Sequence, residues 1–257
     1  MSDFVFFFKM LGATVMALFT AISSIGSVVT DDVAMIAHRG YSGKYPENTS
    51  LAFEMAGRHG SAGAETDIRR TKDGVYVTSH NSEIEFCDGT TAIVEENDFL
   101  FLRSKALKNK KTKDSVYLTT LEEYCEIMKK WDMWCFVELK GEYTDEQIKE
   151  IFTIVENTYR LDKCILQSFS FENLLKAREL FPSLPLMLTY GSDDEGYEKC
   201  FDYGISIDCN INQLSEEMIN SFHSRGLLVA AYTANNLFQK CYAKSFDLDF
   251  LESDYYA

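Results

Sequence analysis

The sequence VAMIAHRGYSGKYPENTSLAF, residues 33–53, contains the unit from which the fold is built. Its first five residues, 33–37, are apolar and have the composition of a buried strand. A polar loop begins at His38, and Asn48 is expected to cap the helix that follows the loop. The segment therefore predicts a strand, a loop and a helix in that order.

The same order of strand, polar turn and helix recurs along the chain. Capping boxes at Thr120–Glu123 and Thr144–Gln147, and N-caps at Ser170 and Ser215, mark the starts of later helices. Eight strands are expected, at residues 33–37, 64–68, 75–79, 135–139, 163–167, 185–189, 204–208 and 227–232. This alternation predicts an α/β protein with a parallel (β/α)₈ TIM barrel. A doubly wound open sheet is the alternative, but the absence of a glycine-rich phosphate loop favours closure.

The composition fits one such barrel and excludes some partners. The chain has 257 residues, and a barrel of this kind needs about 250. Its 40 acidic and 25 basic residues give a net charge of −15, which argues against nucleic acid or anionic lipid as the main partner. A small phosphorylated substrate remains compatible, because a local cation can reverse the field inside one pocket.

The amino terminus and the cysteines indicate different compartments. Residues 1–30 form an apolar leader, and residues 10–29 carry no charge over a length that could cross a bilayer. The leader is interpreted as a membrane anchor, a signal peptide or an apolar helix that closes the bottom of the barrel, with the barrel itself expected over 31–257. Anchoring or export is the favoured expectation. The seven cysteines are odd in number and form no CxxC pair, which favours reduced thiols in the cytoplasm.

Ionisable and polar side chains lie at the carboxyl ends of five of the expected strands. They are His38 with Arg39, Glu65 with Asp67, His80, Glu138 with Lys140, and Gln167. Each feature alone is ordinary, since a histidine after a strand is more often structural than catalytic. In a barrel, however, the carboxyl ends of all strands meet at one mouth, where active sites of this fold lie. The sequence therefore predicts one site at that mouth.

The residue types at this mouth indicate a cation and an anionic substrate. Glu65 and Asp67 share one face of a strand, and the third carboxylate, Glu138, would converge on them. Three carboxylates in a barrel would repel one another unless they bound a cation, and oxygen ligands suit Mg²⁺ or Ca²⁺. Arg39 and Lys140 supply positive charge for a phosphate, and two histidines are suited to act as acid and base.

The order of these motifs resembles the glycerophosphodiester phosphodiesterase family. The resemblance is carried by IAHRGYSGKYPENTSLAF, AETDIRRTKDGVYVTSHN, FVELKG, LQSF and AYTAN, between about Ile36 and Asp254. It implies that the family's acid and base correspond to His38 and His80. It also implies that a divalent cation is held by Glu65, Asp67 and Glu138. The implied substrate-binding or phosphate-binding residues are Arg39, Glu47, Lys140, Gln167 and Tyr232.

The activity that the resemblance implies is metal-dependent hydrolysis of glycerophosphodiesters to glycerol 3-phosphate and an alcohol. Two alternatives stay open. One is a lysophospholipase D, or another phosphodiesterase on the same scaffold, which membrane association through residues 10–29 would favour. The other is a glycerophosphodiester-binding protein with weakened catalysis, because Asn81 stands where the family usually has an aspartate after its second histidine.

Overall fold

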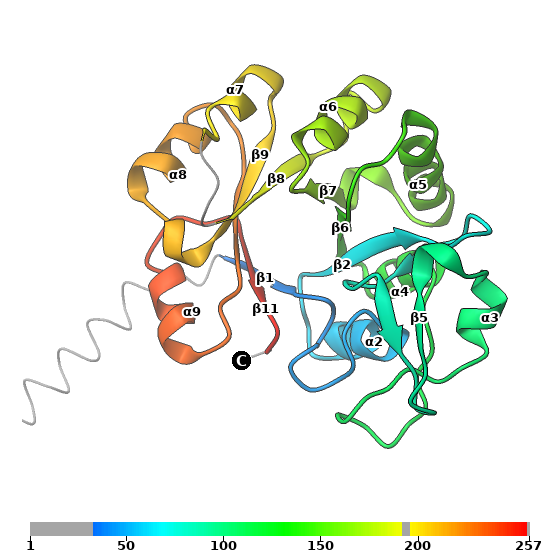
Figure 1. Ribbon diagram of the computed structural model, residues 1–257. Helices are drawn as coiled ribbons and strands as arrows, with labels where there is room; N and C mark the ends of the chain where they lie inside the picture. Colours follow the sequence, from blue (N-terminus) through cyan, green and yellow to red (C-terminus); the bar gives the residue numbers. More distant parts are fainter. Residues whose placement is uncertain (1–32, 192–195, 256–257) are drawn as a thin grey trace, which may run out of the picture.

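A closed barrel of eight parallel strands forms the centre of the molecule (Figure 1). The structure is a computed structural model, which describes residues 33–191 and 196–255. The barrel strands are β1 (Ala34–Ala37), β2 (Gly63–Arg70), β6 (Trp134–Leu139), β7 (Cys164–Ser168), β8 (Leu186–Tyr190), β9 (Ser206–Asn210), β10 (Val229–Tyr232) and β11 (Phe250–Ser253). Neighbouring strands in this order pair in parallel, and pairing of β1 with both β2 and β11 closes the ring. The predicted (β/α)₈ barrel is confirmed.

Helices surround the barrel, and four of them begin where the capping signals placed them. They are α2 (Ser50–Arg58), α3 (Phe99–Arg103), α4 (Leu121–Trp131), α5 (Asp145–Thr158), α6 (Phe171–Leu180), α7 (Lys199–Tyr203), α8 (Glu216–His223) and α9 (Leu237–Ala243). Both predicted capping boxes form, at the starts of α4 and α5, and Ser170 and Ser215 cap α6 and α8. The expectation for Asn48 was wrong, because Thr49 caps α2 and accepts from the Ala52 N–H.

One predicted barrel strand, residues 75–79, lies outside the barrel. The chain there forms β3 (Tyr76–Thr78), which pairs antiparallel with β2, and the eighth barrel strand is instead β11. The reason is the short connection. A parallel crossover needs a dozen or more residues, whereas the turn between β2 and β3 is closed by Thr71, whose Oγ1 accepts from the Val75 N–H at 2.9 Å. The returning strand nevertheless carries His80 to the barrel mouth.

A small excursion follows β3 on the same side of the barrel. It contains the antiparallel pair β4 (Glu83–Glu85) and β5 (Thr91–Ile93), and then helix α3. These elements pack around their own buried apolar cluster, which includes Ile84, Phe86 and Leu102. The excursion therefore forms a second wall beside the segment that carries His80 (Figure 1).

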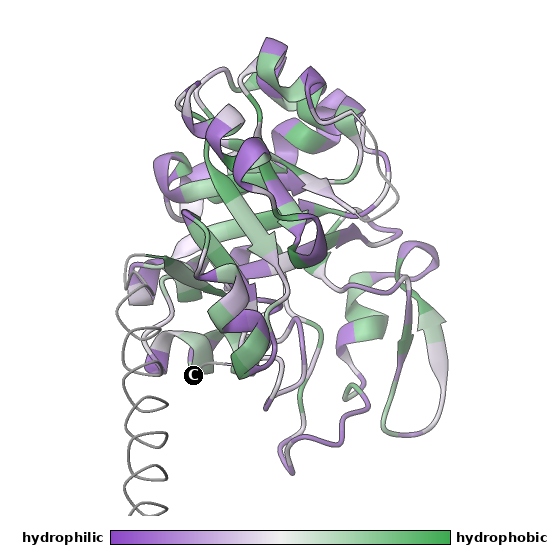
Figure 2. Ribbon diagram, turned by 90° about the vertical axis from the view of Figure 1, so that its left-hand side faces the viewer, coloured by the Kyte–Doolittle hydropathy of each residue, from purple (hydrophilic) through white to green (hydrophobic). Residues whose placement is uncertain are grey.

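The interior of the barrel is layered. A buried apolar layer is formed by Ile36, Phe136, Ile165, Met187, Ala230 and Phe250. Two residues further along the same strands stand His38, Glu138, Gln167, Thr189, Tyr232 and Glu252. Because strand side chains alternate between faces, both sets point inward. Apolar residues predominate along the strands and polar residues on the outer turns (Figure 2). The apolar layer thus forms the floor beneath a polar layer at the mouth.

The structure describes the cysteines but not the apolar leader. All seven cysteines are free, and five of them are buried, as expected for reduced thiols that pack as small apolar side chains. Over residues 33–191 and 196–255, no helix has the length and apolar character needed to cross a bilayer. The predictions for the leader fall on residues outside the described part of the chain.

Candidate active site

The barrel mouth contains a cavity of about 290 Å³ in which most of the predicted site residues meet. Its lining includes His38, Arg39, His80, Glu138, Lys140 and Tyr232. Glu47 lies beside it, in a neighbouring cavity of about 390 Å³ that also reaches His80. Glu65 and Asp67 are buried on β2, and Gln167 lies buried on β7. The structure thus brings together side chains from segments that are far apart in sequence.

Three carboxylates form a compact group in this site. One oxygen from each of Glu65, Asp67 and Glu138 lies within 4.8 Å of the others. The parallel register of β2 and β6 places Asp67 directly opposite Glu138, and all three side chains are buried. The second oxygen of Glu65, Oε1, has no hydrogen-bond partner among the described residues. Such a group can accept a cation.

The electrostatics of the three carboxylates differ. Burial, reinforced by Asp67 and Glu252, raises the pKa of Glu65 well above its usual range. Burial also raises the pKa of Glu138, although Lys140 opposes the shift. For Asp67 burial would raise the pKa, but Lys140 and Arg39 outweigh it and lower the value. Asp67 is therefore the carboxylate whose charge the protein itself compensates best.

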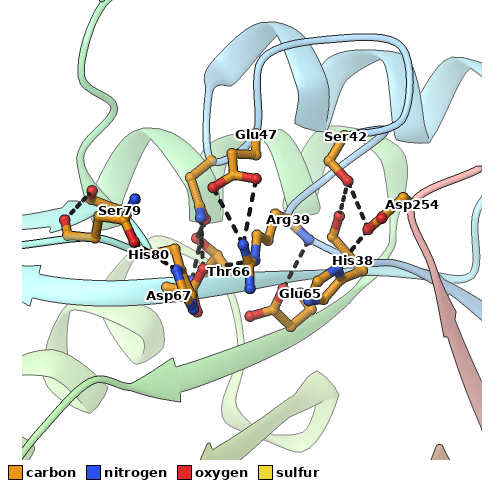
Figure 3. A network of polar contacts seen from close by, with 12 residues as sticks. His38, Arg39, Ser42, Glu47, Glu65, Thr66, Asp67, Ser79, His80 and Asp254 are labelled. Carbon is orange, nitrogen blue, oxygen red and sulfur yellow. Dashed lines mark hydrogen bonds and ion pairs between the residues drawn. The ribbon is translucent and has the colours of Figure 1, made fainter. Parts of the chain in front are cut away.

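Two cations face these carboxylates. The Lys140 ammonium lies 2.9 Å from Asp67 Oδ1 and also contacts Glu138, while Arg39 Nε lies 3.3 Å from Asp67 Oδ2. Arg39 has a left-handed backbone with φ of 55°, an uncommon conformation for a residue other than glycine. In this conformation its N–H donates to Glu65 Oε2 at 2.8 Å, and its guanidinium reaches Glu47 (Figure 3). Both cations are thus fixed at the edge of the carboxylate group.

The two histidines have different partners. The His38 Nδ1–H donates to Asp254 Oδ1 at 2.6 Å, since a carboxylate can only accept, and Nε2 remains available (Figure 3). Nδ1 of His80 lies 3.0 Å from Asn81 Oδ1. Arg69 holds the His80 backbone, because its Nη2 donates to the His80 carbonyl at 2.7 Å. Burial lowers the pKa of His80 although Asp67 opposes the shift, so the neutral imidazole is favoured.

Sequence reasoning missed four polar residues around this site. Asp254 follows β11 and orients His38. Asn48 is buried, and its Nδ2 donates to Asp67 Oδ2 at 2.7 Å. Its Oδ1, the atom that a helix cap would use, instead accepts from Thr66 Oγ1 at 2.8 Å. Asp208 on β9 and Glu252 on β11 line the cavity and are both almost completely buried. A signal was present for Asp208, which ends the strand expected at residues 204–208, whereas Glu252 lies on β11, a strand that was not predicted.

Gln167 lies at the expected strand end and contacts two acidic residues of the site. Its Nε2 donates to Asp208 Oδ2 at 2.8 Å and to Glu252 Oε1 at 2.9 Å. Burial raises the pKa of both carboxyls well above the usual range. Gln167 thus links two carboxyls that line the cavity, and its role in substrate binding stays a prediction.

Comparisons with known proteins agree with this geometry. A glycerophosphodiester phosphodiesterase of Bacillus subtilis is 27% identical over 238 residues, which cover 83% of this chain and 81% of that protein. One of Caldanaerobacter subterraneus is 30% identical over 163 residues, covering 61% of this chain and 66% of the relative. Among solved structures, an Oleispira antarctica phosphodiesterase in complex with the product sn-glycerol-3-phosphate superposes with a TM-score of 0.79 at 22% identity. That superposition covers 90% of this chain and 95% of the other and shows a shared fold.

The family itself follows from a longer match. A model of the glycerophosphoryl diester phosphodiesterase family matches residues 38–255, from the first histidine of the site to the residue after Asp254. This span is well over half of the 257 residues and includes every side chain described above. The chain therefore belongs to the glycerophosphoryl diester phosphodiesterase family.

Proposed function

We propose that this phosphoric diester hydrolase cleaves glycerophosphodiesters to glycerol 3-phosphate and an alcohol, with a divalent cation and two histidines. The observation that carries the proposal is the meeting of His38 and His80 with two cations and a carboxylate group in one cavity. A phosphodiester is an anion, and it needs positive charge at phosphorus and proton transfer at two oxygens. The cavity offers groups suited to each task.

The residues present fit a divalent cation. Glu65, Asp67 and Glu138 would hold it, because their oxygens lie within 4.8 Å of one another and Glu65 Oε1 has no other partner in the described part of the chain. An all-oxygen set favours Mg²⁺ or Ca²⁺. When bound, the cation would reduce the charge of the phosphodiester and align the glycerol hydroxyl with phosphorus.

The side chains of this chain would perform the proton transfers. One histidine removes the proton from the glycerol hydroxyl as that oxygen attacks phosphorus. The other protonates the departing alcohol, and a cyclic phosphate remains. Water then opens the cyclic phosphate with the two roles exchanged, which gives glycerol 3-phosphate. Throughout, Arg39 and Lys140 stabilise the charge on the phosphoryl oxygens. The Nε2 atoms are suited to these transfers, because the Nδ1 atoms are engaged by Asp254 and Asn81.

The contact of Asn81 with His80 bears on the alternative of a binding protein with weakened catalysis. An asparagine lacks the charge of an aspartate, but its Oδ1 still accepts from Nδ1 of His80 at 3.0 Å. Asn81 can therefore still hold the Nδ1 side of the imidazole. This contact supports hydrolysis over binding alone.

The direct test is release of glycerol 3-phosphate from glycerophosphocholine by the full chain with Mg²⁺, with Ca²⁺ and with EDTA. Release that requires a metal would support the proposal and identify the preferred ion. His38→Ala and His80→Ala should each lower the rate by roughly 10²–10⁴-fold. A thermal unfolding midpoint close to that of the wild type would show that the fold survives.

Other outcomes would refute parts of the proposal. Full activity in either histidine variant would refute the acid–base roles. Binding of glycerophosphocholine by calorimetry without cleavage would favour the binding protein. Turnover of lysophosphatidylcholine, with none of glycerophosphocholine, would favour the lysophospholipase D alternative. A matched control is His59→Ala, because His59 ends α2 and packs against Tyr41 outside the cavity lining.

A further inference from the structure

A second group of metal ligands overlaps the first. Ligand atoms of His38, Glu65 and Glu252 lie within 4.8 Å of one another. The three residues come from adjacent strands, because β1, which leads into His38, pairs with β2 on one side and β11 on the other. The proposed function uses His38 and Glu65 but gives Glu252 no role. The group therefore differs in composition from Glu65, Asp67 and Glu138.

Each of these three side chains is also held by a second residue. Asp254 accepts from His38 Nδ1 at 2.6 Å, which leaves Nε2 as the ring nitrogen available to a ligand. The Arg39 N–H donates to Glu65 Oε2 at 2.8 Å, and Gln167 Nε2 donates to Glu252 Oε1 at 2.9 Å. Metal sites commonly have such outer partners, including a carboxylate on the second nitrogen of a ligating histidine.

A buried oxygen that the two ligand groups share also points to a cation at this place. Glu65 is 2% exposed, and its Oε1 has no hydrogen-bond partner in residues 33–191 and 196–255. A buried carboxylate oxygen without a partner is costly, and a cation would satisfy it. Arg39 N–H occupies the other oxygen of Glu65, and Gln167 occupies one oxygen of Glu252. One oxygen on each carboxylate thus remains for a metal.

We propose that His38, Glu65 and Glu252 form an inhibitory Zn²⁺ site. One imidazole and two carboxylates are a common protein ligand set for zinc, with a fourth position left for water. Mg²⁺ instead prefers oxygen ligands in octahedral geometry and is poorly suited to this group. The chemistry of the ligands thus separates the two overlapping groups: the all-oxygen group suits Mg²⁺ or Ca²⁺, and the mixed group suits Zn²⁺.

Inhibition follows if His38 acts as an acid or base, so this half of the inference rests on the proposed function. A zinc ion at Nε2 occupies the lone pair that would accept a proton from the glycerol hydroxyl or from water. Glu65 belongs to both groups, so zinc also draws on a ligand of the catalytic cation. Excess Zn²⁺ should therefore inhibit the enzyme even when Mg²⁺ is saturating.

Binding is tested first, without reference to activity. The full chain, freed of metal with a chelator, is titrated with ZnCl₂ by calorimetry, and Co²⁺ is used as a spectroscopic substitute. All proteins carry Cys87→Ser and Cys241→Ser, because these two thiols are exposed and could bind zinc themselves. Glu252→Gln should weaken Zn²⁺ binding by at least about 10-fold and abolish the visible absorption of tetrahedral Co²⁺.

Asp208→Asn is the matched control. Asp208 is as deeply buried as Glu252, lines the same cavity and accepts from the same Gln167 amide, but it does not belong to the ligand group. It should bind Zn²⁺ as the wild type does. Equal weakening in both variants would mean that only the loss of negative charge matters and would overturn the site. Unchanged binding in Glu252→Gln would also overturn it. Circular dichroism shows whether each variant is folded.

Inhibition is tested second, by adding ZnCl₂ during glycerol 3-phosphate release at saturating Mg²⁺. The zinc concentration that halves the rate should rise at least about 10-fold in Glu252→Gln and stay unchanged in Asp208→Asn. Equal inhibition of Glu252→Gln and wild type would place zinc on the carboxylate group of the catalytic cation and overturn the inference. If the wild type hydrolyses none of the substrates, the proposed function fails, and the binding measurements still decide whether the zinc site exists.

Discussion

Asp254→Asn should slow catalysis because it changes the residue that orients His38. Asp254 Oδ1 accepts from His38 Nδ1 at 2.6 Å. The carboxylate is itself fixed, since Ser42 Oγ donates to Oδ1 at 3.1 Å and Asn235 Nδ2 donates to Oδ2 at 2.6 Å. Burial would raise the pKa of Asp254, but the hydrogen bond with His38 and the other contacts lower it. The contacts around Asp254 therefore favour its charged carboxylate.

The size of the effect follows from this contact. A hydrogen bond to a charged group contributes about 1.5–3 kcal/mol, and each 1.36 kcal/mol of barrier is a factor of about ten in rate. Loss of the charge at Asp254 should therefore reduce kcat roughly 10- to 150-fold. KM should change little, because Asp254 is not among the residues that line the cavity.

The assay is steady-state release of glycerol 3-phosphate at saturating Mg²⁺, with kcat and KM measured separately. Ser42→Ala is the control, because it removes a hydroxyl that contacts the same Oδ1 and the His38 backbone carbonyl but leaves the contact between Asp254 and the His38 imidazole in place. It should retain most of the wild-type kcat. The double variant His38→Ala with Asp254→Asn should be no slower than His38→Ala alone, because a positioning residue acts only through the residue it positions.

Two results would refute this reasoning. One is a wild-type kcat in Asp254→Asn, which would mean that the contact has no catalytic consequence. The other is a further large loss of rate when Asp254→Asn is added to His38→Ala. That loss would assign Asp254 a role that does not pass through the imidazole.

Two substitutions of buried acids should change the free energy of unfolding in opposite directions, and a thiol reagent tests the burial of the cysteines. Asp67→Asn should destabilise the protein by about 1.5–3 kcal/mol in urea unfolding, because it removes the charged carboxylate that Arg39 and Lys140 share and leaves Lys140 with Glu138 and Arg39 with Glu47. Asp208→Asn should stabilise the metal-free protein, since burial raises the pKa of Asp208 and its charged form is unfavourable. A raised folded pKa costs stability as pH rises above the ordinary carboxyl range, so the gain should be larger at pH 8 than at pH 5; an equal gain would contradict this account. Finally, a thiol reagent should modify only Cys87 and Cys241 in the folded protein and all seven cysteines after unfolding.

The repeating units of strand and helix could be predicted because each depends on residues that lie close together in the sequence. Apolar runs of four to six residues alternate with capped helices, and a capping box such as Thr120–Glu123 depends only on residues three apart. The error at residues 75–79 was also physical in origin. VYVTS has strand composition, and composition does not distinguish a parallel from an antiparallel partner. The length of the preceding connection distinguishes them, since the turn between β2 and β3 has no room for the helix that a parallel crossover needs.

The candidate site likewise contains residues that short motifs predict and residues that only the folded barrel brings together. The residues predicted for it lie in motifs a few residues long, such as His38–Arg39 and Glu65–Asp67. The residues that were missed act across the barrel. Asp254 reaches His38 from 216 positions away, through the pairing of β1 with β11 that closes the ring. Asn48 was assigned to a cap because sequence shows that an asparagine precedes a helix, but not that Asp67 lies beside it.

Closure also determines the charge of the site, which no single motif shows. It gathers Glu65, Asp67, Glu138, Asp208 and Glu252 around Arg39 and Lys140, so five carboxyls face two cations. Without metal, burial raises the pKa of four of these carboxyls, and only Asp67 has its pKa lowered. Protons and metal ions therefore compete for the same oxygens. A cation bound among these acids would stabilise the closed barrel, and adding Mg²⁺ or Ca²⁺ should therefore raise the unfolding midpoint more at pH 8 than at pH 5.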